Sequence, residues 1–146
     1  MNFIDFTKIW KRHRQETALI TGEEQITYAE LHQKVRNKSI ALQQAGITPV
    51  DRVALWGGTD VSYIENILAL LHLDVVSVPL SIRFTKRQLN ECLRHSACTK
   101  IIRQHTATEF KISPGIPEFD MDMSDNLIWV KNRNVSHILQ SISHMI

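Results

Sequence analysis

Hydrophobic positions follow helical and strand spacings in turn along the first 103 residues. At the N-terminus, four side chains share one side of a predicted amphipathic helix within residues 1–16: Phe3, Phe6, Trp10 and His13. Two short apolar runs follow at 17–20 and 25–27, and the polar turn TGEE separates them. These runs predict a small β-hairpin.

A capping box marks the start of the next predicted helix. In this motif the Thr27 hydroxyl accepts from a backbone amide, and the Glu30 carboxylate accepts from the amide of Thr27. Gly46 predicts the end of the helix, because glycine tolerates the positive φ that often follows a helix. The apolar stripe of this helix is Tyr28, Leu31, Val35 and Leu42.

Three later apolar runs predict buried strands of a parallel sheet, namely RVALW (52–56), VVSVPL (75–80) and TKIIR (99–103). A helix is predicted between the first two, with the stripe Val61, Ile64, Ile67, Leu68 and Leu71. A second helix is predicted from the capping box of Thr85 and Gln88 onward. The alternation predicts an α/β fold: a Rossmann-like parallel sheet with flanking helices, preceded by a short helix and a hairpin.

Beyond residue 103 the pattern becomes irregular. SPGIP (113–117) predicts a loop, and the acidic patch DMDMSD (120–125) precedes a predicted strand LIWV. A terminal amphipathic helix is predicted from Val135, Ile138, Leu139 and Ile142. We therefore expect one α/β domain over 1–146, divided into a helix at 1–16, a core at 17–103 and a loop and terminal segment at 104–146.

Composition narrows the class of protein. The 146 residues are 43% hydrophobic and 22% charged with a net charge of +2, which excludes disordered, fibrous and disulfide-stapled classes and indicates no nucleic-acid partner. Asp5 and Lys8 interrupt the apolar stretch that a secretory signal needs. No apolar run approaches the length of about eighteen residues that a membrane span requires. We expect a cytoplasmic protein.

The turn WGGTD (56–60) is the first candidate site, because a strand that turns through glycines into a helix cradles phosphate in many nucleotide enzymes. It lacks the spaced glycines of a dinucleotide loop and the Gly-Lys-Ser/Thr ending of a P-loop. Arg52 lies at the wrong end of its strand to serve such a site. The pattern favours a structural turn.

Three further groups of residues carry weak functional signals. Cys92, His95 and Cys98 lack a fourth zinc ligand, so a core thiol at Cys92 is favoured over a metal site. The seven histidines, His137 and His144 among them, are expected to be surface imidazoles. The N-terminal helix is expected to pack by its aromatic face, although membrane or nucleic-acid binding is an alternative for its cations Lys8, Lys11, Arg12 and Arg14.

Residues 17–103 resemble the start of adenylate-forming enzymes, a large family that includes acyl-CoA and aryl-CoA ligases. Four segments carry the resemblance in the family's order: TALI, ITYAELHQKV, QQAGITPVDRVAL and VVSVPLSIRFTKRQLNECLRHSACTKII. The lead IWKRHRQETALI is most similar to that of bacterial 2-succinylbenzoate-CoA ligases of menaquinone synthesis. The chain departs from the family at Asp74, where a glycine is usual, and at GGTD, which replaces a Pro-Asn-Ser turn.

The resemblance implies an enzyme that uses ATP, Mg²⁺ and CoA to convert a carboxylate to an acyl-adenylate and then to an acyl-CoA. The family's phosphate loop is rich in Ser, Thr and Gly and ends in Pro-Lys. Here the last glycine is Gly115, and LIWVKNRNVSHILQ stands where that loop is expected.

No catalytic, cofactor-binding or metal-binding residue of the family can therefore be placed on this chain. We expect an N-terminal fragment of a ligase, inactive alone, whose partner is the missing remainder of the enzyme or a second copy. The alternative is a non-catalytic binding or self-association module that keeps the fold.

Overall fold

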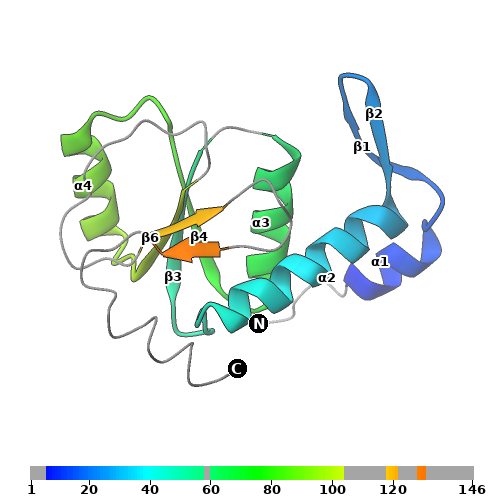
Figure 1. Cartoon of the computed structure of the whole chain (residues 1–146), viewed down its shortest axis with the longest axis horizontal. Helices are drawn as coiled ribbons and strands as arrows, with labels where there is room; N and C mark the ends of the chain where they lie inside the picture. Colours follow the sequence, from blue (N-terminus) through cyan, green and yellow to red (C-terminus); the bar gives the residue numbers. More distant parts are fainter. Residues whose placement is uncertain (1–5, 58–59, 104–117, 122–127, 131–146) are drawn as a thin grey trace.

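The computed structural model describes residues 6–57, 60–103, 118–121 and 128–130 (Figure 1). The first part consists of α1 (Phe6–Arg12), the hairpin β1 (Thr17–Thr21) and β2 (Glu24–Thr27), and α2 (Tyr28–Gln44). The core follows as β3 (Arg52–Trp56), α3 (Val61–His72), β4 (Val76–Leu80), α4 (Lys86–His95) and β5 (Lys100–Arg103). Two short strands, β6 (Glu118–Met121) and β7 (Ile128–Val130), complete the described elements. The predicted elements of residues 6–103 are thus confirmed, with small shifts at their ends.

The sheet has the strand order β4-β3-β5-β6-β7. β3 is parallel to β4 and β5, β6 is parallel to β5, and β7 is antiparallel to β6. The LIWV strand is confirmed as β7, whereas β6 was not predicted. The predicted terminal helix around Val135 and Ile142 lies outside the described residues.

Helices cover both faces of this sheet, as the α/β prediction requires. Side chains alternate along β3, so that Val53 and Leu55 join a core with α2 and α3. Ala54 and Trp56 join a second core with α4, on the opposite face. Figure 1 shows α2 and α3 side by side, with α4 apart from them.

The prediction that VVSVPL is a buried strand is wrong. β4 lies at the end of the strand order, Val76 is 45% exposed, and Pro79 is exposed as well. Proline lacks the amide that an inner strand needs, so it suits a strand with a neighbour on one side only. The run of β-branched residues indicated a strand correctly, but it did not distinguish an edge from the centre of the sheet.

The predicted apolar stripe of α3 forms only part of its inner face. Val61, Ile67 and Leu68 are partly buried and pack against the core, as predicted. The buried residues of this helix are Glu65, Asn66, Ala69 and Leu70, whereas Leu71 is 37% exposed. α3 carries apolar side chains around most of its circumference, so periodicity alone does not reveal which side faces the core. A pair between Lys34 on α2 and Glu65, whose nitrogen and oxygen lie 3.7 Å apart, joins the two helices at this buried face.

The backbone is left-handed at Asp74, where φ is 59°. This is one of the two positions at which the sequence departs from the family pattern. The left-handed region favours glycine, because a Cβ there approaches the neighbouring carbonyl oxygen. The structure therefore gives a physical reason for the glycine that the family usually has at this place. Gly46 also has a positive φ, 91°, as predicted for the end of α2.

Candidate functional site

The turn after β3 places an aspartate on the N-terminus of α3. Asp60 is the N-cap residue, and its Oδ1 accepts a hydrogen bond of 2.9 Å from the amide of Tyr63. A helix N-terminus binds anions through such amides. Because the Asp60 carboxylate already occupies this position, a phosphate group would meet a negative charge there. This geometry supports a structural turn, although residues 58 and 59 lie outside the described part.

The carboxyl ends of β3 and β5 meet at a topological switch point. The chain leaves β3 towards β4 on one side, and it leaves β5 towards β6 on the other. Open α/β sheets bind ligands at such points. Here the guanidinium carbon of Arg103 lies 4.9 Å from the centre of the Trp56 ring. Arg103 is only 8% exposed and Trp56 is fully buried, so a buried cation–π pair joins the ends of these two strands.

The amino ends of the same strands carry a second polar cluster. Asp51 is 5% exposed, and its Oδ1 lies 2.6 Å from Lys100 Nζ and 2.8 Å from the Oγ1 of Thr99, which donates to it. Its Oδ2 accepts from the amide and the hydroxyl of Thr48. Burial raises the pKa of Asp51, but the hydrogen bonds from Lys100, Thr48 and Thr99 outweigh burial and hold the pKa below its ordinary value.

Sequence reasoning missed both clusters. Arg103 and Trp56 are the last residues of neighbouring strands, and Asp51 and Lys100 lie at the start of the same two strands. The sequence signal that could have indicated these clusters was the presence of charged or aromatic residues at the ends of the predicted strands. Pairing them required the strand order, which periodicity does not supply.

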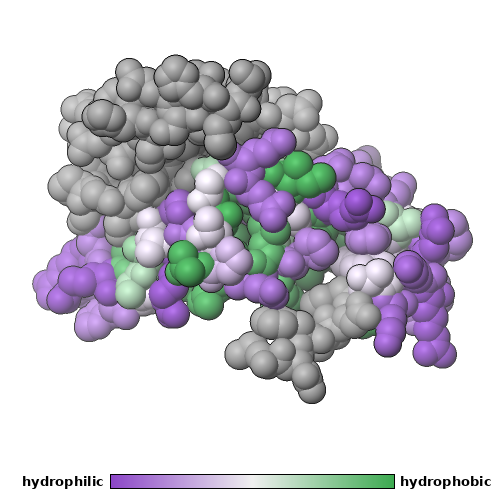
Figure 2. All heavy atoms as spheres, turned by 90° about the horizontal axis from the view of Figure 1, so that it is seen from below, coloured by the Kyte–Doolittle hydropathy of each residue, from purple (hydrophilic) through white to green (hydrophobic). Residues whose placement is uncertain are grey.

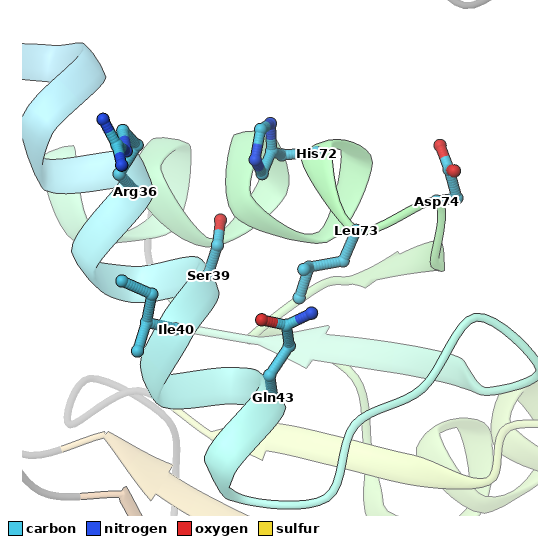
Figure 3. A pocket seen from close by; sticks show the side chains of 7 residues that line it. All are labelled: Arg36, Ser39, Ile40, Gln43, His72, Leu73 and Asp74. Atoms are coloured by element: carbon cyan, nitrogen blue, oxygen red, sulfur yellow. The ribbon is translucent and has the colours of Figure 1, made fainter.

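A hollow of about 360 Å³ lies between α2 and the end of α3 (Figure 3). Its wall on α2 is formed by Arg36, Ser39, Ile40 and Gln43, and its wall on α3 and the following turn by His72, Leu73 and Asp74. Sequence reasoning did not single out this group. The residues come from two elements far apart in the sequence, and no motif joins them.

The cysteine and histidine candidates lie at different depths in the described structure. Within the part of the chain that the structure describes, no three His, Cys, Asp or Glu side chains are grouped to hold a metal ion. Cys98 is buried in the core beneath α4, Cys92 is half-buried against that core, and His95 is exposed. Burial raises the pKa of the Cys98 thiol, which disfavours the reactive thiolate.

The N-terminal helix packs against α2 through Trp10 of its predicted aromatic face, whereas Phe3 and the side chain of Phe6 lie outside the described part. Trp10 is 7% exposed and stacks on His32 of α2, with ring centres 5.4 Å apart. The ring of Tyr28 meets Trp10 edge-on at 5.9 Å. The four cations Lys8, Lys11, Arg12 and Arg14 are exposed. His137 and His144 lie in residues 131–146, which are outside the described part of the chain.

Among the described residues, Trp56, Asp60 and Arg103 lie at the carboxyl ends of β3 and β5. Asp60 caps the helix terminus that follows the glycines, and Arg103 lies over the Trp56 ring at the switch point. Among the described helices, none is long and apolar enough to cross a membrane.

Comparison with known proteins identifies the class. The model of the family described as AMP-binding enzyme matches residues 6–136, so the chain belongs to this family of adenylate-forming enzymes. Feruloyl-CoA synthases of Amycolatopsis sp and Streptomyces sp are each 31% identical over 116 residues, which is 75% of this chain and 24% of theirs. The chain thus spans about a quarter of the length of these curated relatives.

Solved structures support the same fold. The N-terminal subdomain of NpsA from Klebsiella oxytoca has a TM-score of 0.70 at 23% identity, with 80% of this chain and 30% of that chain covered. The O-succinylbenzoate coenzyme A synthetase of Bacillus subtilis has a TM-score of 0.68 at 16% identity, with 71% and 27% covered. At these identities the likeness shows the fold alone. The lead IWKRHRQETALI therefore gains no specific support for a 2-succinylbenzoate ligase.

Proposed function

We propose that this chain is the N-terminal portion of an ATP-dependent, AMP-forming acyl-CoA or aryl-CoA ligase. Such an enzyme converts a carboxylate, ATP and CoA into an acyl-CoA, AMP and pyrophosphate. The observation that carries this proposal is the family match across residues 6–136. The chain's own contribution is the scaffold formed by the sheet of β3, β4 and β5 with its flanking helices.

The phosphate chemistry is proposed to belong to the remainder of the enzyme. Stabilising a triphosphate in a transition state needs converging amides and cations, and Mg²⁺ needs carboxylate oxygens. In the described residues the amides at the start of α3 face Asp60 instead. We therefore expect ATP, Mg²⁺ and CoA to be held by residues outside this chain, and the chain alone to be inactive.

The substrate is proposed to be a carboxylate that carries a ring. The feruloyl-CoA synthase relatives are named for an aromatic acid, and the N-terminal lead resembles 2-succinylbenzoate-CoA ligases. If the substrate is 2-succinylbenzoate, deletion of the gene lowers the menaquinone content of the host. An unchanged menaquinone content would remove that substrate. Location in the cytoplasm is part of the same proposal.

A hybrid enzyme tests the scaffold role. Residues 6–136 of this chain would replace the matching N-terminal segment of the Streptomyces feruloyl-CoA synthase. The hybrid is expected to catalyse ferulate-dependent exchange of pyrophosphate into ATP, because the host supplies the phosphate site. The control is the host without its N-terminal segment, which is expected to show no exchange. A hybrid that folds, as judged by circular dichroism, yet shows no exchange would contradict the proposal.

A self-association module is the second candidate. Leu71 on α3 and Val76 on the edge strand β4 are both exposed apolar residues. Figure 2 shows that apolar side chains also reach the surface between hydrophilic ones on the face seen from below. Edge strands and apolar patches are surfaces through which proteins associate.

Sedimentation of the purified chain over a range of concentrations decides this candidate. If the chain dimerises through β4, Val76→Lys is expected to give a monomer. The matched control Ile20→Lys, on the exposed hairpin, is expected to leave the dimer intact. A wild-type chain that stays monomeric at the highest concentration would rule the module out.

A further inference from the structure

The hollow between α2 and the end of α3 has one wall formed by a single helix face. Arg36, Ile40 and Gln43 lie at i, i+4 and i+7 along α2, so their side chains project in the same direction. The opposite wall is the last residue of α3, His72, with the turn that follows it. Figure 3 shows Arg36 and His72 on opposite walls, with the Ser39 hydroxyl pointing towards the space between them.

Two of these groups have donors that nothing in the described part uses. Neither Arg36 nor His72 forms a hydrogen bond or an ion pair within the described residues. Ser39 differs, because its hydroxyl donates to the carbonyl of Val35 at 2.8 Å. Its oxygen can therefore only accept from a ligand.

Positive charge also gathers around His32, which lies one turn before Arg36 on α2. The pKa of His32 is lowered, first by burial and then by the charges of Arg36, His72, Arg14 and Lys11. The nearby acid Glu65 is already paired with Lys34. Two carbonyls in the last turn of α3 are also occupied, since Leu70 accepts from Val75 and Leu71 accepts from Asp74.

We propose that this hollow binds the phosphate group of a small phosphate monoester, which Arg36 and His72 hold from opposite walls. A tetrahedral phosphate can accept hydrogen bonds from two walls at once, and the guanidinium fork matches its oxygens. The side-chain amide of Gln43 lies one turn beyond Ile40 along the same helix face and donates to the ester end. The volume of about 360 Å³ leaves room for a small organic group beyond the phosphate.

Asp74 determines what lies at the other end of the ligand. Its side chain stands beyond Leu73, at the end of the hollow away from Arg36 (Figure 3). A second anionic group would be repelled there, so the ligand has one phosphate and a neutral or cationic end. This site does not depend on the proposed ligase function, because its residues and the test below involve no adenylation.

Titration of the purified chain followed by backbone amide NMR and calorimetry tests the site. Inorganic phosphate and glycerol 3-phosphate are the two probes, with sodium acetate at equal ionic strength as the reference. Both phosphates are expected to bind saturably and to shift the amide signals of Ser39, Gln43 and Leu73. Tighter binding of glycerol 3-phosphate identifies the monoester as the ligand. Equal or tighter binding of inorganic phosphate would overturn the monoester proposal.

Variants show where phosphate binds and which charged side chains strengthen or weaken the binding. Arg36→Ala and His72→Ala are each expected to weaken phosphate binding about tenfold, and Asp74→Asn to strengthen it severalfold. The control Arg87→Ala removes an exposed arginine on α4 that pairs with Glu91, and it is expected to change nothing. The proposal is overturned if phosphate does not bind, if acetate gives the same shifts, or if Arg36→Ala and Arg87→Ala have equal effects.

Discussion

An aspartate lies beside each end of β3, and the two aspartates make different kinds of contact. Asp51, before the strand, is buried and joins Lys100, Thr99 and Thr48. Asp60, after the strand, is exposed and caps α3 through the amide of Tyr63. The first contact ties together segments far apart in the chain, and the second is local.

This difference separates the contacts at the amino ends of the strands from those at the carboxyl ends. At the amino ends of the strands, buried polar contacts hold β3 against β5. At the carboxyl ends, where α/β folds usually bind ligands, Asp60 caps α3 and Arg103 lies over Trp56. Among the described residues, side chains of the chain itself thus meet at both ends of β3 and β5, which agrees with a scaffold role.

Substitution of Asp51 is expected to have the largest effect. Asp51→Asn leaves Lys100 without its partner in a site that is 20% exposed for the lysine and 6% for the aspartate. Because water reaches the lysine in part, the loss should be about 2 kcal/mol, below the range for a fully buried pair. Urea unfolding measures it, and Glu91→Gln in the exposed pair with Arg87 is the matched control, expected to cost less than about 0.5 kcal/mol. Equal costs for the two variants would contradict the contrast.

The stability of the wild type at low pH tests the same residue, because protonation removes the charge of Asp51 and leaves its side chain in place. The pKa of Asp51 lies below its ordinary value of 3.8 in the folded protein. The stability that Asp51 contributes is therefore present above its unfolded pKa and is lost as the pH falls through the lower folded pKa. We expect the wild type to lose more stability than Asp51→Asn between pH 5 and pH 2, two limits set roughly by carboxylate titration. Parallel curves for the two proteins would contradict the assignment.

The inner face of α3, which links the two ends of the sheet, offers the next test. Asn66 is fully buried, and its Nδ2 and Oδ1 have no hydrogen-bond partner among the described residues. An unsatisfied buried amide costs about 1–3 kcal/mol, and alanine also favours the helix. After the loss of some packing, Asn66→Ala is expected to stabilise the chain by about 1 kcal/mol in thermal and urea unfolding. Destabilisation would show that the amide has a partner outside the described part.

Removal of the Asp60 cap of α3, at the carboxyl end of β3, is expected to lower the stability by a smaller amount and only locally. Asp60→Ala leaves the Tyr63 amide without its acceptor and should cost about 1 kcal/mol. Asp60→Asn is the control that keeps the acceptor, and it should cost much less. Hydrogen exchange at the first turn of α3 would report the change. A loss as large as that of Asp51→Asn would break the proposed contrast between the two aspartates.

The smallest expected effect is at Asp74. Its backbone is left-handed, and a side chain in this conformation lowers the stability of the fold. Asp74→Gly should raise stability by about 0.5 kcal/mol, as relief of this strain outweighs the added freedom of the unfolded chain. Ala45→Gly provides the opposite control, because Ala45 caps α2 with a right-handed backbone and gains nothing from glycine. Differential scanning calorimetry measures both. A loss of stability in Asp74→Gly would mean that the aspartate side chain makes a stabilising contact.

Local signals in the sequence predicted most of the described elements. The capping boxes at Thr27 and Thr85 are contained in four residues each, and both are present as predicted. β6 was missed because the segment EFDM has no apolar run, and it is a strand through its pairing with β5, where Ile102 lies opposite Phe119. The same reason applies to the contact of Asp51 with Lys100 and to the hollow beside Arg36. Each depends on which elements become neighbours.

Exchange of labelled pyrophosphate into ATP by the purified chain tests the central claim most directly, namely that this chain is a scaffold and not a complete adenylation site. Ferulate, 2-succinylbenzoate and benzoate would be offered in turn with Mg²⁺, and the Streptomyces feruloyl-CoA synthase with ferulate would be the positive control. We predict no carboxylate-dependent exchange with any of the three acids. Exchange above the no-carboxylate background would mean that these 146 residues assemble a phosphate site by themselves, and the scaffold role would be wrong.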